Sequence, residues 1–418
     1  MNKNIILICS WLIYLIPLAL LTGPFLPDLF ASIIGILTTF LIIKEKKYSY
    51  FNNNYFYFFI TFYLCLILST MFAESIFISL ESSLFYFRFG LFAIGVWYLI
   101  ENNKKIIRYF SIFLLVTFIF ALLDGYYQVF NGPNIFGYDV GGVRLALTLN
   151  DKAILGGYLA RLFPLLFAVL IYSFDLKKSY ILLMLLILIF TDVLIFISGE
   201  RTALGLLFLS TVFIIIFLSK YKKIRFLTFL VSLVIMTFLA LYNPAIKERN
   251  IDHTLNQFYK DGSLTLFSKR HESHIGGAWN MFRESPLIGQ GPKMFRVLCN
   301  DSRFNYNDDT CSTHPHNTYA QLAAETGILG LLFIFLLCFK VIKVVLEHGI
   351  LYIRKQKYLL SDFQVCLIAC LIVTLWPIIP SQNFFNNWIN VIYYLPIGFL
   401  LYSIHMKKKI LKYNNYNP

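Results

Sequence analysis

The chain has 418 residues, of which 58% are hydrophobic and only 14% are charged, with a net charge of +14 and a mean hydropathy of +0.68. Water-soluble domains carry nearer a quarter charged residues, so the composition argues against a soluble enzyme. At about 20 apolar residues per membrane span, the length allows about a dozen helices and one sizeable extramembrane segment. We therefore expect an all-α polytopic membrane protein with about 12 transmembrane helices and one large periplasmic loop.

Twelve apolar runs are long enough to span a bilayer. In chain order they are 4–22, 25–43, 55–72, 84–100, 106–125, 153–174, 180–198, 202–219, 225–242, 318–346, 359–379 and 388–405. They divide the chain into residues 1–242, with nine helices and a short periplasmic segment at 126–152, a large periplasmic loop at 243–317, three helices in 318–405 and a cytoplasmic tail at 406–418. A structureless loop as long as the large one would be uncommon, so we expect the chemistry there.

The distribution of Lys and Arg predicts the orientation, because cytoplasmic connections are enriched in them. With both termini cytoplasmic, the inner connections hold nineteen basic residues, whereas the short outer ones hold only Arg144, Lys152 and Arg201. The nineteen are Lys44, Lys46, Lys47, Lys104, Lys105, Arg108, Lys177, Lys178, Lys220, Lys222, Lys223, Arg225, Arg354, Lys355, Lys357, Lys407, Lys408, Lys409 and Lys412. The positive charge thus indicates topology, and no nucleic-acid partner is expected.

The histidine-rich end of the large loop is the first candidate for chemistry. His314 and His316 precede Asn317, and an apolar helix is predicted to begin immediately afterwards. The positive end of a helix disfavours imidazolium, so a neutral His316 is a reasonable proton acceptor. The alternative is that His316 only anchors an interfacial helix. A metal site is not expected, because the His-x-His pair has no Cys or carboxylate at ligand spacing.

Charged residues at the membrane boundary give a second signal. Arg201 follows Glu200 in a connection so short that its guanidinium must lie at the outer boundary, where an unpaired charge is costly. It either forms a salt bridge with Glu200, extends to water, or clamps an anionic group such as phosphate. The other embedded charges could pair with one another: Arg88, Arg161, Asp124, Asp192 and Glu325.

Two of the seven cysteines, Cys299 and Cys311, lie in the large loop. An oxidising compartment would favour a disulfide between them, although both could also be free. The other five lie in apolar helices and are most simply core residues.

The motifs together resemble the O-antigen ligase and polymerase superfamily, bacterial glycosyltransferases that act on lipid-linked glycans. The pattern that carries the resemblance is His316-Asn317, nine residues, and then Gly327-x-x-Gly330 entering a helix. The Pro-Leu-Ile-Gly-Gln-Gly run at 286–291 and the Asp-Gly-Tyr-Tyr-Gln run at 124–128, followed by Arg144, are also similar to the family. The resemblance implies a multi-pass protein of the cell inner membrane with its active site facing the periplasm.

By this resemblance His316 matches the family's essential histidine, Arg201 an essential arginine, and Arg270, by a looser alignment, a second one. Substrate-binding roles are expected for a further set: Arg144, Arg88, His314, Asn317 and Glu325. The implied donor is a glycan on undecaprenyl pyrophosphate, and the acceptor is either lipid A–core, for a ligase, or a second lipid-linked repeat, for a polymerase. The sequence does not decide between these acceptors.

The implied chemistry needs no cofactor and no metal. The diphosphate is already a good leaving group, so arginines could stabilise its charge while His316 takes the acceptor proton. The competing interpretation is a transporter or flippase of lipid-linked oligosaccharides, which would also need many helices. A transporter of that kind is expected to show internal repeats and interrupted helices, and no repeat is visible in the sequence.

Overall fold

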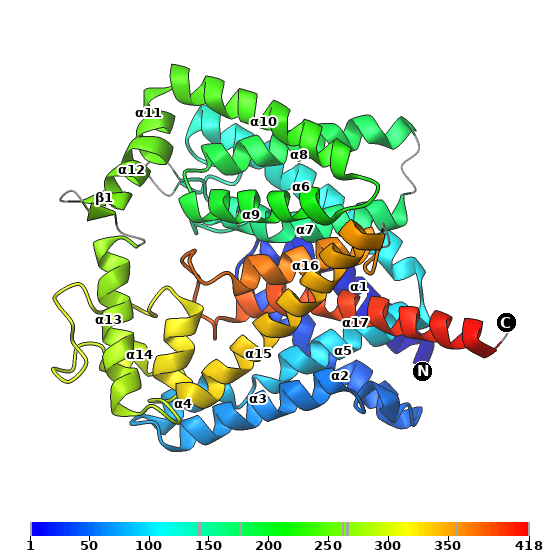
Figure 1. Cartoon of the computed structure of the whole chain (residues 1–418), viewed down its shortest axis with the longest axis horizontal. Coiled ribbons are helices and arrows are strands. Elements are labelled where there is room, and N and C mark those ends of the chain that lie inside the picture. The colour runs from blue at the N-terminus through cyan, green and yellow to red at the C-terminus, as the bar shows by residue number, and fades with distance from the viewer. Residues whose placement is uncertain are drawn as a thin grey trace.

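The computed structural model describes residues 2–139, 144–174, 178–260, 263–264, 267–355 and 358–416. Its first half contains the helices α1 (Asn2–Leu20), α2 (Phe25–Lys44), η1 (Tyr48–Tyr50), α3 (Asn54–Met71), α4 (Ile76–Ser83), α5 (Phe87–Asn102), α6 (Lys105–Asn131), α7 (Leu155–Ser173), α8 (Lys178–Ile197), α9 (Arg201–Phe217) and α10 (Lys222–Tyr242). The described part of the chain is therefore mainly helical (Figure 1).

The second half begins with short elements and ends with three long helices. They are α11 (Pro244–Lys247), η2 (Glu248–Asp252), α12 (His253–Phe258), β1 (Tyr259–Lys260), β2 (Ser263–Leu264), α13 (Lys269–Glu284), α14 (Phe295–Leu298), α15 (Thr318–Lys355), α16 (Asp362–Leu375) and α17 (Asn387–Tyr416). The β1–β2 pair is antiparallel and only two residues long on each side. Parts of the predicted segments lie outside the described residues: residue 1, 140–143, 175–177 with the connection residue Lys177, 261–262 with 265–266, 356–357 with the connection residue Lys357, and 417–418.

Each of the twelve predicted apolar runs falls on a helix. Within the described ranges, nine helices are long and apolar enough to cross a membrane, and three shorter apolar helices cover 181–197, 201–217 and 362–375. A multi-pass, all-helical membrane protein is therefore confirmed, while the count of twelve spans and their orientation stay predictions. In Figure 1 the labels N and C lie at the end of the bundle opposite α13 and α14.

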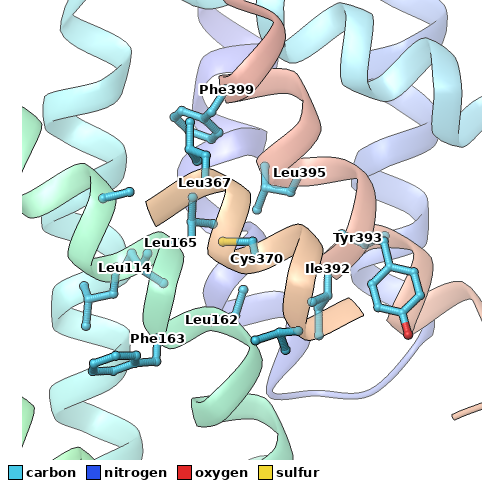
Figure 2. Packing of buried hydrophobic residues seen from close by; sticks show 14 of the residues in the cluster. Leu114, Leu162, Phe163, Leu165, Leu367, Cys370, Ile392, Tyr393, Leu395 and Phe399 are labelled. Carbon is cyan, nitrogen blue, oxygen red and sulfur yellow. The ribbon is translucent and has the colours of Figure 1, made fainter. Parts of the chain in front are cut away.

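The bundle is built around α7, which is apolar on every side. All of its residues from Leu155 to Ile171 are buried, as expected for a helix surrounded by other helices rather than by lipid. Figure 2 shows Leu162 and Leu165 of α7 packed near Leu367 and Cys370 of α16. α7 is therefore the central helix of the bundle.

A buried ion pair joins α8 to α10. Arg225 donates two hydrogen bonds to the Asp192 carboxylate, at 2.7 and 2.9 Å, and both side chains are fully buried. Ser232 also donates to Asp192 at 2.9 Å, and the Arg225 guanidinium lies over the ring of Phe163. The prediction that Arg225 belongs to an inner connection is therefore wrong, because this arginine lies inside the bundle, paired with a carboxylate that is 33 residues away in sequence.

The predicted apolar helix at 318–346 is broken at Gly327, whose φ of 62° and ψ of −161° are non-helical. The 286–291 run lies across this break. The backbone of Ile328 donates to Pro286 at 2.8 Å, and that of Gly291 donates to the carbonyl of Glu325 at 2.9 Å. A side chain at position 327 would collide with the backbone of Leu287, so the glycine is required by close approach as well as by its positive φ.

Candidate active site at one end of the bundle

His316 lies in the turn that leads into α15. Its φ of 53° is in the left-handed region, which is uncommon for a residue with a side chain. The turn is held by the segment after α16, since the Ser381 backbone donates to the His316 carbonyl at 2.9 Å and Thr318 donates to the Ser381 hydroxyl at 2.8 Å. Unusual backbone conformations that are held in this way are concentrated at functional sites.

Asn317, for which a substrate-binding role was expected, caps α15 in the structure. Its side-chain oxygen accepts hydrogen bonds from the backbones of Tyr319 and Ala320, both at 3.0 Å. Its side-chain nitrogen donates to the Pro377 carbonyl at 2.8 Å. The cap orients the start of the helix next to His316, so Asn317 acts on the site through the backbone.

The imidazole of His316 lies among those of three other histidines. Its ring centroid lies 4.0 Å from that of His314, and 5.5 Å from those of His271 and His274 on α13. His271 and His274 are three residues apart, so they share one face of the helix. We refer to these four residues as the histidine cluster.

The three outer rings of the cluster are held by hydrogen bonds. The Nδ1 of His274 donates to the Thr310 carbonyl at 3.0 Å, and the Nδ1 of His271 lies 2.7 Å from the hydroxyl of Ser268. The Nε2 of His314 donates to the Ser381 carbonyl at 3.3 Å. No hydrogen bond to the ring of His316 occurs among the described residues, so this imidazole has a nitrogen available to a substrate.

The environment of the cluster favours the neutral form of His316, His314 and His271. Burial, together with the neighbouring imidazoles and Arg270, lowers the pKa of His316 to about 3. Burial also lowers the pKa of His314, to about 4, and that of His271, which in addition faces Arg201 and Arg270. At neutral pH each of these rings is therefore an uncharged group that can accept a proton.

Arg201 and Arg270 lie within electrostatic reach of the cluster. Arg201, the first residue of α9, lies within electrostatic reach of Arg249 and Arg144, and its guanidinium donates to the His253 carbonyl at 3.3 Å. Burial and the charge of Arg144 lower the pKa of Arg249. The predicted pair Arg201 and Arg270 thus both act on the histidine cluster, whereas Arg144 and Arg249 lie near Arg201. Such a group of cations fits an anionic ligand.

Glu200 does not bond to Arg201 in the structure. Its two carboxylate oxygens accept hydrogen bonds from the backbones of Gly156 and Gly157 at the start of α7, at 2.7 and 3.2 Å. Burial raises the pKa of Glu200 to about 7, and these backbone bonds, together with Arg161 and Arg144, oppose that rise. This carboxylate therefore joins α7 to the start of α9 and offsets part of the positive charge.

Two residues that were expected to bind substrate have other contacts. The Arg88 guanidinium bonds to both oxygens of Asp28, at 2.7 and 3.1 Å. Glu325 is fully buried and accepts hydrogen bonds from the Phe295 backbone at 3.1 Å and from the Gln321 side chain at 3.0 Å. Both carry out structural roles here, since Arg88 joins α5 to α2 and Glu325 joins α15 to α14.

A disulfide braces the loop behind the cluster. Cys299 and Cys311 are bonded, with their Cα atoms 5.1 Å apart. Cys311 follows Thr310, whose carbonyl accepts the hydrogen bond from His274. The disulfide therefore holds the segment that orients one of the four imidazoles.

The histidine cluster does not have the arrangement of a metal site. Within the described ranges, no group of three or more His, Cys, Asp or Glu side chains is placed to hold a metal ion.

Sequence reasoning missed His271, His274, Arg249 and Glu200. The signal for the two histidines was present, because a spacing of three residues in a helix capped by Ser268 places both on one face. Arg249 and Glu200 gave no comparable signal, since their neighbours come from distant parts of the chain.

The fold and the site define a polytopic membrane protein with a cationic, histidine-rich site at one end of its helices. Residues 183–335 match the family model of O-antigen ligase. The match confirms the similarity to the O-antigen ligase and polymerase superfamily, whose members are glycosyltransferases, and it includes Arg201, Arg270 and His316. No curated protein matches the chain.

Proposed function

We propose that the protein transfers a glycan from undecaprenyl pyrophosphate to a sugar hydroxyl during the synthesis of a surface polysaccharide. The observation that carries the proposal is the neutral His316 ring, which lies in a cluster of imidazoles beside Arg201 and Arg270. In the reaction the acceptor oxygen forms a bond to the anomeric carbon, and the bond from that carbon to the diphosphate oxygen breaks. The acceptor proton moves to His316.

His316 is the general base. A pKa of about 3 makes the ring neutral but only weakly basic while the site is empty. A bound diphosphate offsets the charge of Arg270 and adds negative charge near the ring, which raises the pKa of His316 because opposite charges favour the protonated form. Donor binding therefore makes His316 a stronger base at the moment when the acceptor proton must leave.

Arg201 and Arg270 hold the diphosphate, and Arg249 and Arg144 add positive charge. The planar guanidinium matches phosphate with two parallel hydrogen bonds. Charge that develops on the departing diphosphate is stabilised by these fixed cations, so transfer requires neither a metal nor an acid for the leaving group. Activity should therefore persist in EDTA.

The proposed location is the inner membrane, with the site facing the periplasm and both termini in the cytoplasm. The basis is the asymmetry of Lys and Arg along the chain. Reporter fusions at residue 260 and at the C-terminus test it. The two fusions are expected on opposite sides of the membrane, and finding both on one side would refute the topology.

The direct test of function is transfer in vitro from a purified lipid-linked donor by the detergent-solubilised protein. The wild-type chain is expected to form a product, and His316→Ala is expected to form it about 100- to 10,000-fold more slowly. His253→Ala is the matched control, because the side chain of His253 is exposed in the same loop and lies 3.7 Å from Glu248, while the backbone carbonyl that accepts from Arg201 is kept in the variant. A transporter of lipid-linked glycans would form no product with any of the three proteins.

The acceptor is identified by deleting the gene and separating the surface glycans on a gel. Loss of all long chains, with lipid-linked polymer accumulating, identifies a ligase. Lipid A–core capped by a single repeat identifies a polymerase.

A further inference from the structure

A cavity lies beside α15 at the end of the bundle that is remote from the histidine cluster. It has a volume of about 470 Å³ and is bounded by α15, α16, α17 and the segment before α16. Its wall is apolar except for Lys340, Lys407 and Gln364. Gln364 is occupied in the N-terminal cap of α16, so the two lysines give the cavity its charge.

The cavity continues into a second one of about 210 Å³. Leu337, Leu371, Leu400 and Ile404 line both cavities, so the two spaces adjoin. The second cavity reaches Phe384 and is lined by aromatic and aliphatic side chains with a single threonine. We refer to the two spaces together as the α15–α17 groove, which is charged at one end and apolar along the rest.

The apolar part is at least as long as one leaflet of a bilayer. Its wall on α17 extends from Tyr393 to Ile404, roughly 16 Å, and its wall on α15 from Leu322 to Leu337, roughly 22 Å, at about 1.5 Å per helical residue. The hydrocarbon of one leaflet is about 15 Å, half of the roughly 30 Å core. An acyl chain that enters at the lysine end therefore fits within the groove.

The two lysines differ from their neighbours in what they contact. Lys340 is exposed at the mouth of the groove, with its ammonium 4.8 Å from the ring centroid of Phe58. Lys407 donates to the carbonyl of Leu359. Lys343, one turn further along α15, lies 4.0 Å from Glu347 instead and does not line the groove. The nearby Asp362 carboxylate is engaged by the backbones of Ser219 and Lys220.

We propose that the α15–α17 groove binds an anionic phospholipid, with the phosphate between Lys340 and Lys407 and one acyl chain extending toward Phe384. Basic residues between membrane helices attract anionic headgroups in this way. A polyprenyl donor is a poorer occupant of the groove. If its diphosphate lay at the histidine cluster, its hydrocarbon chain, and not a phosphate, would lie beside the ammonium groups of Lys340 and Lys407. The lipid supports α15, the helix that Asn317 caps next to His316. The site goes beyond the proposed transfer reaction and does not depend on it.

The test measures lipid retention by native mass spectrometry and thermal unfolding of the full-length protein in detergent. The probes are phosphatidylglycerol, which is anionic, phosphatidylcholine, which is zwitterionic, and undecaprenyl phosphate. The variants are Lys340→Gln with Lys407→Gln, and Leu371→Trp, which places a larger ring where the two cavities meet. Lys343→Gln is the matched control, since it removes an exposed charge from the same helix outside the groove.

We expect phosphatidylglycerol to bind and to raise the unfolding temperature more than phosphatidylcholine does. Each lysine substitution should weaken its binding about 5-fold, the equivalent of roughly 1 kcal/mol for each basic residue near the headgroup. Lys343→Gln should bind as the wild type does. Equal retention by the wild type and the double lysine variant, equal binding of the two phospholipids, or preferential binding of undecaprenyl phosphate would each overturn the proposal. If Leu371→Trp does not fold, the lysine variants still decide the question.

Discussion

Two arginine-containing regions lie on neighbouring helices but in opposite electrostatic settings. Arg225 of α10 is fully buried, and both oxygens of Asp192 accept its hydrogen bonds. Arg201 at the start of α9 donates to the His253 carbonyl and has the like charges of Arg249 and Arg144 within electrostatic reach. A buried charge with a matched partner holds helices together, whereas like charges gathered at one place cost stability and indicate an anionic ligand. The comparison predicts that the first region controls folding and the second controls activity.

Removing the partner of Arg225 should have the largest effect on stability. Asp192→Asn leaves the guanidinium buried without its counter-charge, and breaking a buried pair typically costs about 3–5 kcal/mol. Thermal unfolding in detergent measures the loss. An unchanged unfolding temperature would show that the pair does not hold α8 to α10.

Reducing the disulfide should be the next largest change in stability. Cys299 and Cys311 close a short loop, and chain entropy assigns roughly 3 kcal/mol to such a crosslink. Cys299→Ser with Cys311→Ser should therefore lower the unfolding temperature, and mass spectrometry of non-reduced peptides should find the two cysteines joined. Recovery of both thiols in alkylated form would contradict the prediction.

Arg201→Lys should give the opposite pattern to Asp192→Asn. Lysine keeps the charge but loses the planar fork that holds phosphate at two points, and loss of one fixed group that stabilises developing charge costs about 100-fold or more in turnover. The unfolding temperature should stay close to that of the wild type. Wild-type turnover by this variant would remove Arg201 from the diphosphate site.

The pH dependence refines the account of the histidine cluster. Because burial lowers the pKa of His316 to about 3, its neutral form persists as the pH falls and is lost only near that value. The pH dependence of kcat/KM reports the ionisation of the free enzyme, so on the acid side kcat/KM should fall to half its maximum well below pH 6.5, the ordinary histidine pKa. On the acid side kcat should fall to half its maximum at a higher pH than kcat/KM does, because bound diphosphate raises the pKa of His316. Half-maximal kcat/KM at pH 6.5 would indicate an imidazole in ordinary surroundings.

His314→Ala should have the smallest effect. Its ring bonds to the Ser381 carbonyl at 3.3 Å and packs on His316, so it orients the turn rather than taking the proton. The loss of turnover should stay below the roughly 100-fold that marks loss of a general base. A larger loss, with the unfolding temperature unchanged, would assign the proton transfer to His314.

The contrast between the two arginines also explains what the sequence could predict. Hydrophobic runs locate helices because each helix satisfies its own backbone, and for this reason all twelve runs fall on helices. Arg225 was assigned to a connection because its partner, Asp192, is visible only once α8 and α10 pack together. The break at Gly327 was hidden for the same reason, since it depends on the crossing of the 286–291 run.

The candidate site was predictable where its residues are local. His316 follows from a motif at the start of a helix, whereas the capping role of Asn317 was not predicted. The spacing of His271 and His274 contained a signal that was not used. The approach of Arg249 to Arg201, and the bonding of Glu200 to the start of α7, depend on loop packing that periodicity does not report.

The measurement that tests the central claim most directly separates donor binding from transfer in His316→Ala. The purified variant is compared with the wild type and with His253→Ala, first for the affinity of the lipid-linked donor and then for single-turnover transfer. The account predicts wild-type donor affinity and a rate about 100- to 10,000-fold lower, because the arginines remain while the proton acceptor is gone. Near-normal transfer by correctly folded His316→Ala would contradict it.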